Sequence, residues 1–460
     1  MALTAVLALV LGLIQLGERS LANDEGVSAE IGHRHMSSLL YYVHYVEPNN
    51  ILYFGFLHFW EKLGSSDAFL RVPSLTAFPV AVAFTAAIAW RSFGRAAGVV
   101  AGLLLALNAL ALHHAQNARA YSWLMALVAA STLCFILAVE RPTARRWAIW
   151  VAVSALAAYA HPFALFVVAA QAISLAWLPS SRIPWRKAAV AAAPLTVVVA
   201  PLIVLLATGN TSRIDWVQPL EAGRVWNVLE EVAGAENHPL LLELYLCLGL
   251  VLLVGALMMR PRRGEAAWRT LLAVLCFAVP VVLVGLFSVV QPAFLAYYLI
   301  VAVPGLAVMA AGALARIPLP LAVAALVALC LVHTRGLSDW YRGQGPDFRG
   351  AAAVLRAHAR WEDAIVSDPG GNSTVAWYLG RTPNVPGPGA EWRARSIDDE
   401  AELLSFHRMP RVWLVQAAPG NRFDNRVPLR ALGRRRVLRV WNLHNVRVAL
   451  LGRPLAAGEN

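Results

Sequence analysis

The sequence predicts a polytopic α-helical membrane protein that carries a small α/β domain at its carboxyl end. Its 460 residues are 59% hydrophobic and only 14% charged, which is too apolar for an ordinary soluble protein. Apolar runs of about 16–22 residues, long enough to cross roughly 30 Å of hydrocarbon, recur until residue 333. Helix and strand patterns typical of soluble domains follow. We therefore expect a transmembrane domain, 1–334, and an extracytoplasmic α/β domain, 335–460.

The apolar runs predict about eleven transmembrane helices. His161-Pro162 interrupts the long run near residue 160. One long tilted helix there would place basic loops on both sides of the membrane, so we expect two spans. The predicted spans are 2–17, 72–90, 96–112, 122–139, 147–160, 162–178, 188–207, 240–259, 270–290, 294–315 and 317–333.

Basic residues alternate with the spans and predict which loops are cytoplasmic. Short loops rich in Lys and Arg stay in the cytoplasm, so the amino terminus is expected inside and the carboxyl-terminal domain outside. The net charge of +12 is largely explained by these loops and an Arg-rich tail that can contact anionic lipids, and it needs no nucleic acid. The basic loops contain Arg91 and Arg95; Arg141, Arg145 and Arg146; Arg182, Arg186 and Lys187; Arg260, Arg262, Arg263 and Arg269; and Arg316.

Two features of the spans have ordinary explanations. All four cysteines fall inside apolar runs and read as small buried hydrophobes, not as disulfides or metal ligands. Ser20-Leu21-Ala22 resembles a signal-peptide cleavage site, but no basic segment precedes the first apolar run. We expect that run to remain as an uncleaved helix.

Two outer loops are longer than helix connections require, and the tail has mixed periodicity. The first outer loop, 18–71, contains an apolar, aromatic stretch, 50–63, that suits a helix lying in the membrane interface. The second, 208–239, has room for a short helix. In the tail we expect a helix at 348–360, strands at 363–367 and 411–415, a loop at 382–389 and a hairpin at 437–451.

Asp24 and Glu25 follow the first span, where the chain leaves the membrane on the outer side. A carboxylate there can act as general base toward a hydroxyl if it lies within hydrogen-bond reach. The alternative is a solvated acidic end of a helix, and the pair alone does not decide between them. Glu47 is a third acid expected at the same surface. It lies, with the polar residue Asn49, just before the interfacial helix.

Arg119 is a strong cation in a short outer loop, against the trend of the other loops. A guanidinium at the membrane boundary suits a phosphate group, although it can also serve as a snorkelling anchor. His161 interrupts an apolar run at the same surface and reads either as a satisfied hydrogen bonder or as a sugar or phosphate contact. The histidines at 33, 35 and 44 match no metal-ligand spacing, so we expect no metal site there.

The ordered motifs resemble those of the GT-C glycosyltransferases, in the branch of the protein O-mannosyltransferases, the aminoarabinose transferase of lipid A and bacterial relatives with an RgtA/B/C/D-like domain. Residues 20–25 (SLANDE) are similar to the family's S-L-W-x-D-E, and 116–121 (QNARAY) to its Q-E-A-R-x-Y. The similarity also runs through 47–54, 57–60, 70–74 (LRVPS) and 159–161. It is clear over about the first 180 residues and weaker beyond them. Asn117 replaces the family's Glu, and Tyr297 stands where relatives often have Arg.

The resemblance implies an inverting glycosyltransferase that moves a sugar, such as mannose or another hexose or pentose, from a polyprenyl phosphate to a lipid, glycan or protein. Asp24, with Glu25, would supply the catalytic base on the outer face of a bacterial cytoplasmic membrane. No cofactor is required, while a divalent cation is compatible with the chemistry. A polytopic transporter or lipid-linked sugar flippase is the alternative. The expected substrate-binding residues are Glu47, Asn49, Arg71, Gln116, Asn117, Arg119, Tyr121 and His161.

Overall fold

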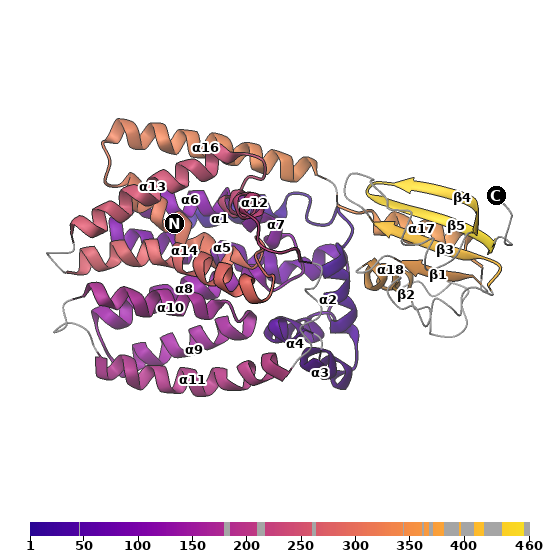
Figure 1. Ribbon diagram of the computed structural model, residues 1–460, viewed down its shortest axis with the longest axis horizontal. Helices are drawn as coiled ribbons and strands as arrows, with labels where there is room; N and C mark the ends of the chain where they lie inside the picture. Colours follow the sequence, from indigo (N-terminus) through magenta and orange to yellow (C-terminus); the bar gives the residue numbers. More distant parts are fainter. Residues whose placement is uncertain are drawn as a thin grey trace. The chain divides into compact units, whose positions relative to one another are not determined.

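The computed structural model is mostly helical and falls into two compact units (Figure 1). The bundle unit comprises Met1–Ile14, Met36–Phe56 and Arg71–Arg342. The tail unit comprises Gln15–His35, Leu57–Leu70 and Gly343–Asn460, so two stretches of the first outer loop pack with the carboxyl-terminal domain. The predicted boundary at residue 334 lies inside a helix, Leu319–Arg342. The structure describes residues 1–45, 47–178, 185–208, 217–259, 264–343, 345–360, 363–367, 371–380, 395–396, 409–417 and 435–454.

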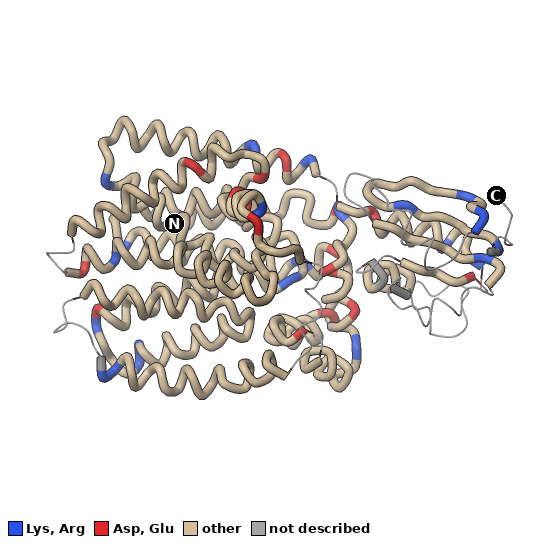
Figure 2. Tube along the Cα trace, viewed as in Figure 1, with Lys and Arg blue, Asp and Glu red and all other residues tan. Residues whose placement is uncertain are grey.

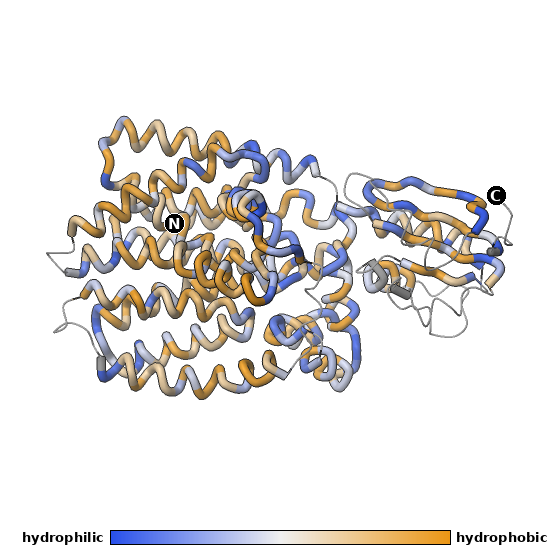
Figure 3. The backbone as a smooth tube through the Cα atoms, viewed as in Figure 1, coloured by the Kyte–Doolittle hydropathy of each residue, from blue (hydrophilic) through white to orange (hydrophobic). Residues whose placement is uncertain are grey.

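Each predicted span falls on a helix or on a pair of helices of the bundle unit. Among the described residues, six helices are long and apolar enough to cross a membrane, or seven if one bent pair counts as a span. The full count of eleven stays a prediction. Figure 3 shows the long stretches of these helices as predominantly hydrophobic. The helices are α1 (Ala2–Leu13), α5 (Asp67–Phe93), α6 (Arg95–Ala106), α7 (Ala109–Ala115), α8 (Tyr121–Glu140), α9 (Ala144–Ala160), α10 (Ala164–Ser174), α11 (Trp185–Thr208), α13 (Pro239–Met258), α14 (Glu265–Val290), α15 (Val303–Leu314) and α16 (Leu319–Arg342).

The helix breaks have identifiable causes. The predicted span 96–112 bends by 64° between α6 and α7, because Asn108 caps the new helix. Its Oδ1 accepts a hydrogen bond from Ala111 N at 2.9 Å, while its Nδ2 donates to two carbonyls at the end of α12 (Ala222–Ala233). At His161 the chain ends α9 and starts α10 three residues later, which confirms the predicted break there.

The first span is shorter than predicted. It was expected to run to residue 17, but α1 ends at Leu13. Gln15 has a φ of 59°, a left-handed conformation that a continuing α-helix does not contain. The chain therefore leaves the helix four residues early, and the stretch that follows belongs to the tail unit.

The basic loops of the bundle unit lie at one end of it. Glu140 accepts hydrogen bonds from Arg91 at 2.9 Å and from Arg269 at 2.7 Å, which joins three loops. Lys187 contacts the Pro142 carbonyl and Arg316 donates to Thr270, which brings in two more. Figure 2 shows Lys and Arg at the left-hand helix ends of the bundle, and others at the opposite ends. These contacts bring described parts of the five predicted basic loops together; Arg182, Arg260, Arg262 and Arg263 lie outside the described residues.

Three short elements of the bundle unit connect the spans near the opposite end. They are α3 (Met36–Tyr45), the 3₁₀ turn η1 (Pro48–Asn50) and η6 (Leu299–Ala302), while η2 (Leu175–Trp177) extends α10. The predicted interfacial helix is α4 (Ile51–Trp60), and α12 is the expected short helix of the second outer loop. The helix α3 was not predicted, because its sequence is too mixed to show a clear apolar face.

The tail unit contains a five-stranded mixed sheet of order β2-β1-β3-β5-β4. The strand β1 is parallel to β2 and β3, whereas β5 is antiparallel to β3 and β4. The structure contains the predicted helix at 348–360, both predicted strands and the hairpin. The sequence did not predict α2, α18 or β2. The expected loop at 382–389 lies outside the described residues. The elements are α2 (Asn23–His33), α17 (Phe348–His358), β1 (Ala364–Ser367), α18 (Gly371–Gly380), β2 (Arg395–Ser396), β3 (Val412–Ala417), β4 (Arg435–Leu443) and β5 (Val446–Pro454).

Candidate active site

Arg119 is the centre of a buried polar cluster in the bundle unit. It lies in the turn between α7 and α8 and is only 6% exposed. Its Nη2 lies 2.5 Å from Glu47 Oε1 and makes an ion pair, and its carbonyl oxygen accepts a hydrogen bond from Ser74 at 2.9 Å. The guanidinium also lies over the Phe54 and Tyr121 rings. A buried guanidinium held in this way is fixed in place and keeps a strong preference for anions.

Glu47 is oriented by two further side chains. Asn50 Nδ2 donates to its Oε1 at 2.7 Å, and the Tyr42 hydroxyl donates to its Oε2 at 3.3 Å. Asn50 is almost fully buried, and Asn49 beside it in η1 is half-buried. The sequence identified Glu47 and Asn49 but missed Tyr42 and Asn50 as supports, because neither has a charge or spacing that marks it.

Gln116 is engaged by the protein itself. Its Nε2 donates to the Gly12 and Ile14 carbonyls at 3.1 and 2.6 Å, and its Oε1 accepts from Trp340 Nε1 at 2.8 Å. These bonds tie the end of α1 and the helix α16 to the turn that carries Arg119. The expected substrate contact of Gln116 stays a prediction.

Asn117 and Arg71 are both buried near this end of the bundle unit. Asn117 is 8% exposed, and within the described residues its Oδ1 has no hydrogen-bond partner. Arg71 is 3% exposed and lies near the start of α5, three residues before Ser74. Both positions place polar groups in the apolar interior close to the Arg119 turn.

A cluster of aromatic and imidazole rings adjoins Arg119. Tyr121 lies 4.6 Å from His114, 6.4 Å from His161 and 5.5 Å from Tyr297, measured between ring centroids. His161 in turn lies 5.2 Å from Tyr298. The structure therefore brings Tyr121 and His161 together, as expected, and adds His114, which sequence reasoning had passed over. We call these five residues the ring cluster.

His161 is an uncharged hydrogen bonder. Burial, and then the nearby charge of Arg119, lower its pKa to about 3. Its Nδ1 accepts a hydrogen bond from Phe163 N at 3.2 Å, so the proton of the neutral ring lies on Nε2. In the described part of the chain Nε2 has no hydrogen-bond partner. The ring thus offers one buried N–H donor and no charge.

The two acids after the first span have different surroundings in the tail unit. Glu25 is 2% exposed, and its Oε2 accepts a hydrogen bond from Ala22 N at 2.9 Å, which closes the first turn of α2. Asp24 is exposed in the same turn, where the helix dipole favours negative charge. Of the two, Asp24 is therefore the acid exposed to solvent, while Glu25 supports the helix.

Metal-binding geometry is not present in the described segments. They contain no group of three or more His, Cys, Asp and Glu side chains placed to hold a metal ion. Glu47 is already bonded to Arg119 and Asn50, and position 117 carries an amide in place of a carboxylate. We derive no step through a metal.

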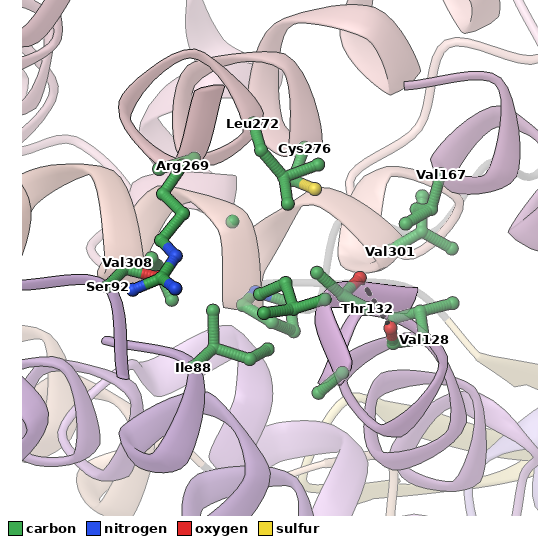
Figure 4. A pocket seen from close by; sticks show the side chains of 15 residues that line it. Ile88, Ser92, Val128, Thr132, Val167, Arg269, Leu272, Cys276, Val301 and Val308 are labelled. Carbon is green, nitrogen blue, oxygen red and sulfur yellow. Dashed lines mark hydrogen bonds between the residues drawn. The ribbon is translucent and has the colours of Figure 1, made fainter. Parts of the chain in front are cut away.

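A separate small cavity lies among the spans (Figure 4). It is lined by residues such as Val128, Thr132, Arg269 and Cys276, and encloses about 20 Å³, which is room for one water molecule. It is too small for a sugar, so we assign it no part in the site.

No family model and no curated protein matches the sequence. Solved structures do match over the full length. ArnT from Cupriavidus metallidurans in the apo state has a TM-score of 0.64 at 15% identity, with 97% of each chain covered. The same protein bound to undecaprenyl phosphate has a TM-score of 0.60 at 14% identity, covering 98% of this chain and 97% of that one. This chain has the fold of the GT-C glycosyltransferases.

A second GT-C protein matches more loosely. The archaeal oligosaccharyltransferase AglB from Archaeoglobus fulgidus, in complex with an inhibitory peptide and a dolichol-phosphate, has a TM-score of 0.53 at 12% identity. The alignment covers 89% of this chain and 69% of that one. The structural similarity therefore includes residues of both the bundle unit and the tail unit. At this low identity it shows the fold and does not identify the site residues.

Proposed function

We propose that this chain is a glycosyltransferase that takes its sugar from a lipid-linked phosphate donor. The observation that carries the proposal is Arg119, a guanidinium buried and fixed by Glu47 in a full-length GT-C fold. A guanidinium is a donor whose geometry suits the oxygens of a phosphate. ArnT has been solved with undecaprenyl phosphate and AglB with a dolichol-phosphate, which supports a donor of this chemistry.

The reaction we propose is a single inverting displacement. The acceptor hydroxyl oxygen attacks the anomeric carbon, and the bond from that carbon to the phosphate oxygen breaks. The electron pair leaves with the phosphate, and the hydroxyl proton passes to Asp24. Arg119 stabilises the growing negative charge on the phosphate; preorganised donors of this kind contribute about 2.7–4 kcal/mol. Because phosphate is a good leaving group, neither a general acid nor a nucleotide is needed.

The ring cluster and Asn117 supply the proposed sugar contacts. The buried Nε2–H of His161 can donate to a sugar oxygen, and the Oδ1 of Asn117 can accept from a sugar hydroxyl. Tyr121 and Tyr297 offer ring faces to the apolar side of a sugar. These groups are neutral, so they favour hydroxyl recognition over recognition of a charged substituent.

The membrane side and acceptor belong to the same proposal. The basic loops lie at the end of the bundle opposite the Arg119 turn, which supports transfer on the outer face of a bacterial cytoplasmic membrane. The acceptor is a lipid, glycan or protein hydroxyl. The structural neighbours give no support to the alternative of a transporter or flippase.

Transfer by purified protein tests the proposal. Polyprenyl-phosphate sugars, each radiolabelled, are supplied with membrane extracts as the source of acceptor. Asp24→Asn should express normally and lower turnover by about 10²–10⁴-fold, the usual contribution of a general base. Glu30→Gln removes another acid from the same helix and should leave turnover unchanged. Full activity of Asp24→Asn would refute the base assignment, and no transfer from any lipid-linked donor would refute the function.

A further inference from the structure

The segment that leads into Asp24 is held by the carboxyl-terminal domain. Within the tail unit, Ser20 Oγ donates to the Pro346 carbonyl at 2.5 Å and accepts from Phe348 N at 3.2 Å. Leu21 is fully buried, and its N–H donates to the Tyr378 hydroxyl at 2.7 Å. These partners are more than 320 residues away in the sequence. The backbone just before the proposed base is therefore fixed by α17 and α18.

Tyr378 belongs to a hydrogen-bonded triad with Asp67 and Arg349. Its hydroxyl accepts from Leu21 N and donates to Asp67 Oδ2 at 2.5 Å. Arg349 donates to the same carboxylate oxygen at 2.5 Å, and also to the Gly17 carbonyl at 3.2 Å. Because a hydroxyl has one proton, the bond to Asp67 directs the Tyr378 lone pairs toward the Leu21 amide. The carboxylate thus sets the direction of the contact to the backbone.

A second contact restrains the first turn of α2 from α18. Thr374 Oγ1 donates to the carbonyls of Ala22 and Asn23 at 3.3 and 3.4 Å. A Cβ added to Gly26 would lie 2.0 Å from Thr374 Oγ1, so only glycine permits this close approach. The residues on both sides of Asp24 are therefore packed against one helix of the domain.

We propose that the carboxyl-terminal domain of this protein is a positioning element for the base, and that Tyr378 and Thr374 are its positioning residues. The inference rests on the proposed function, because it assigns the domain a role through Asp24. Neither side chain needs to touch the substrate. They fix the backbone of residues 21–23 and so fix where the Asp24 carboxylate can reach. A base displaced by about 1 Å can lose 10²-fold in rate.

Tyr378→Phe tests the inference, since it keeps the ring and removes the hydroxyl. We expect kcat to fall by about 10-fold to 100-fold with the donor KM unchanged. Hydrogen–deuterium exchange of the peptide containing Leu21 should become faster, because the amide loses its acceptor. In an Asp24→Asn background the same substitution should have no further effect on the residual rate, since positioning requires the carboxylate.

Two other variants complete the design. Thr374→Val keeps the side-chain shape and should lower kcat in the same way, which preserves the test if Tyr378→Phe fails to fold. Trp413→Phe is the matched control: it removes a partly buried hydrogen bond from Trp413 Nε1 to Asp363 in the same domain, far in sequence from residues 17–23. It should lower the stability of the domain and leave kcat unchanged.

The outcomes separate this inference from the proposed function. An unchanged kcat in both Tyr378→Phe and Thr374→Val, while Asp24→Asn is inactive, would overturn the inference alone. The inference would also be overturned if Tyr378→Phe lowered kcat by the same factor with and without the Asp24 carboxylate. The effect of Tyr378 would then not act through Asp24. Full activity of Asp24→Asn would instead refute the assignment of Asp24 as the base, whatever the results for Tyr378→Phe and Thr374→Val.

Discussion

The Arg119–Glu47 pair allows a quantitative test of the donor site. Glu47→Gln keeps the side-chain shape and an oxygen for Arg119, but removes the charge that balances a guanidinium only 6% exposed. Loss of one partner of a buried ion pair costs about 3–5 kcal/mol. Because the Glu47 side chain is 17% exposed and glutamine still accepts a hydrogen bond, we expect a loss near the lower end, about 3 kcal/mol.

An anionic ligand should restore part of that loss. If Arg119 binds the donor phosphate, a polyprenyl phosphate at about 100 times its Kd stabilises the native protein by about 2.7 kcal/mol. In Glu47→Gln the phosphate meets a guanidinium with no balancing charge, so the stabilisation should be larger than in the unsubstituted protein. The measurement is the shift in melting temperature on adding undecaprenyl phosphate in detergent, followed by tryptophan fluorescence.

Glu140→Gln provides the control. Glu140 is also a buried acid, paired with Arg91 and Arg269, but at the basic end of the bundle. It should lose stability in the same way, and the lipid phosphate should stabilise it no more than the unsubstituted protein. Equal lipid-induced shifts in the Glu47 and Glu140 variants would contradict the assignment of Arg119 to the phosphate.

Two further predictions concern other buried titratable groups. Burial, and then the charge of Glu236, raise the pKa of Glu231 from 4.5 to about 7. Between these pH values the folded chain therefore binds more protons than the unfolded chain. The free energy of unfolding falls as the pH rises through that window. Glu231→Gln should therefore raise the melting temperature at pH 8 but not at pH 4, and an equal change at both would contradict the shift. His161→Phe keeps the ring contacts but removes the Nε2–H donor; we expect kcat/KM for the donor to fall about fivefold to tenfold with no change in its pH profile, because a ring with a pKa of about 3 is neutral throughout. A new pH dependence in that variant would refute the neutral-donor role.

Local features of the sequence predicted the bundle and much of the tail. Apolar runs and the alternation of basic loops are short-range patterns, and the structure joins those loops at one end of the bundle through contacts such as Arg269 to Glu140. The charged positions Glu47 and Arg119 were also singled out this way, because charge in an apolar context is visible without a fold. The helices α2, α3 and α18 were missed because their mixed sequences carry no clear periodicity.

The sequence alone determined which segments are membrane-length and how their charged ends alternate, since both depend on residues that are neighbours along the chain. Only the tertiary structure decided the pairings. Arg119 pairs with Glu47, which lies 72 residues away in the sequence. Leu21 donates to Tyr378, which lies 357 residues away. Nothing in either local sequence specifies such a partner, because a hydrogen bond between distant groups forms only after packing has removed both from water.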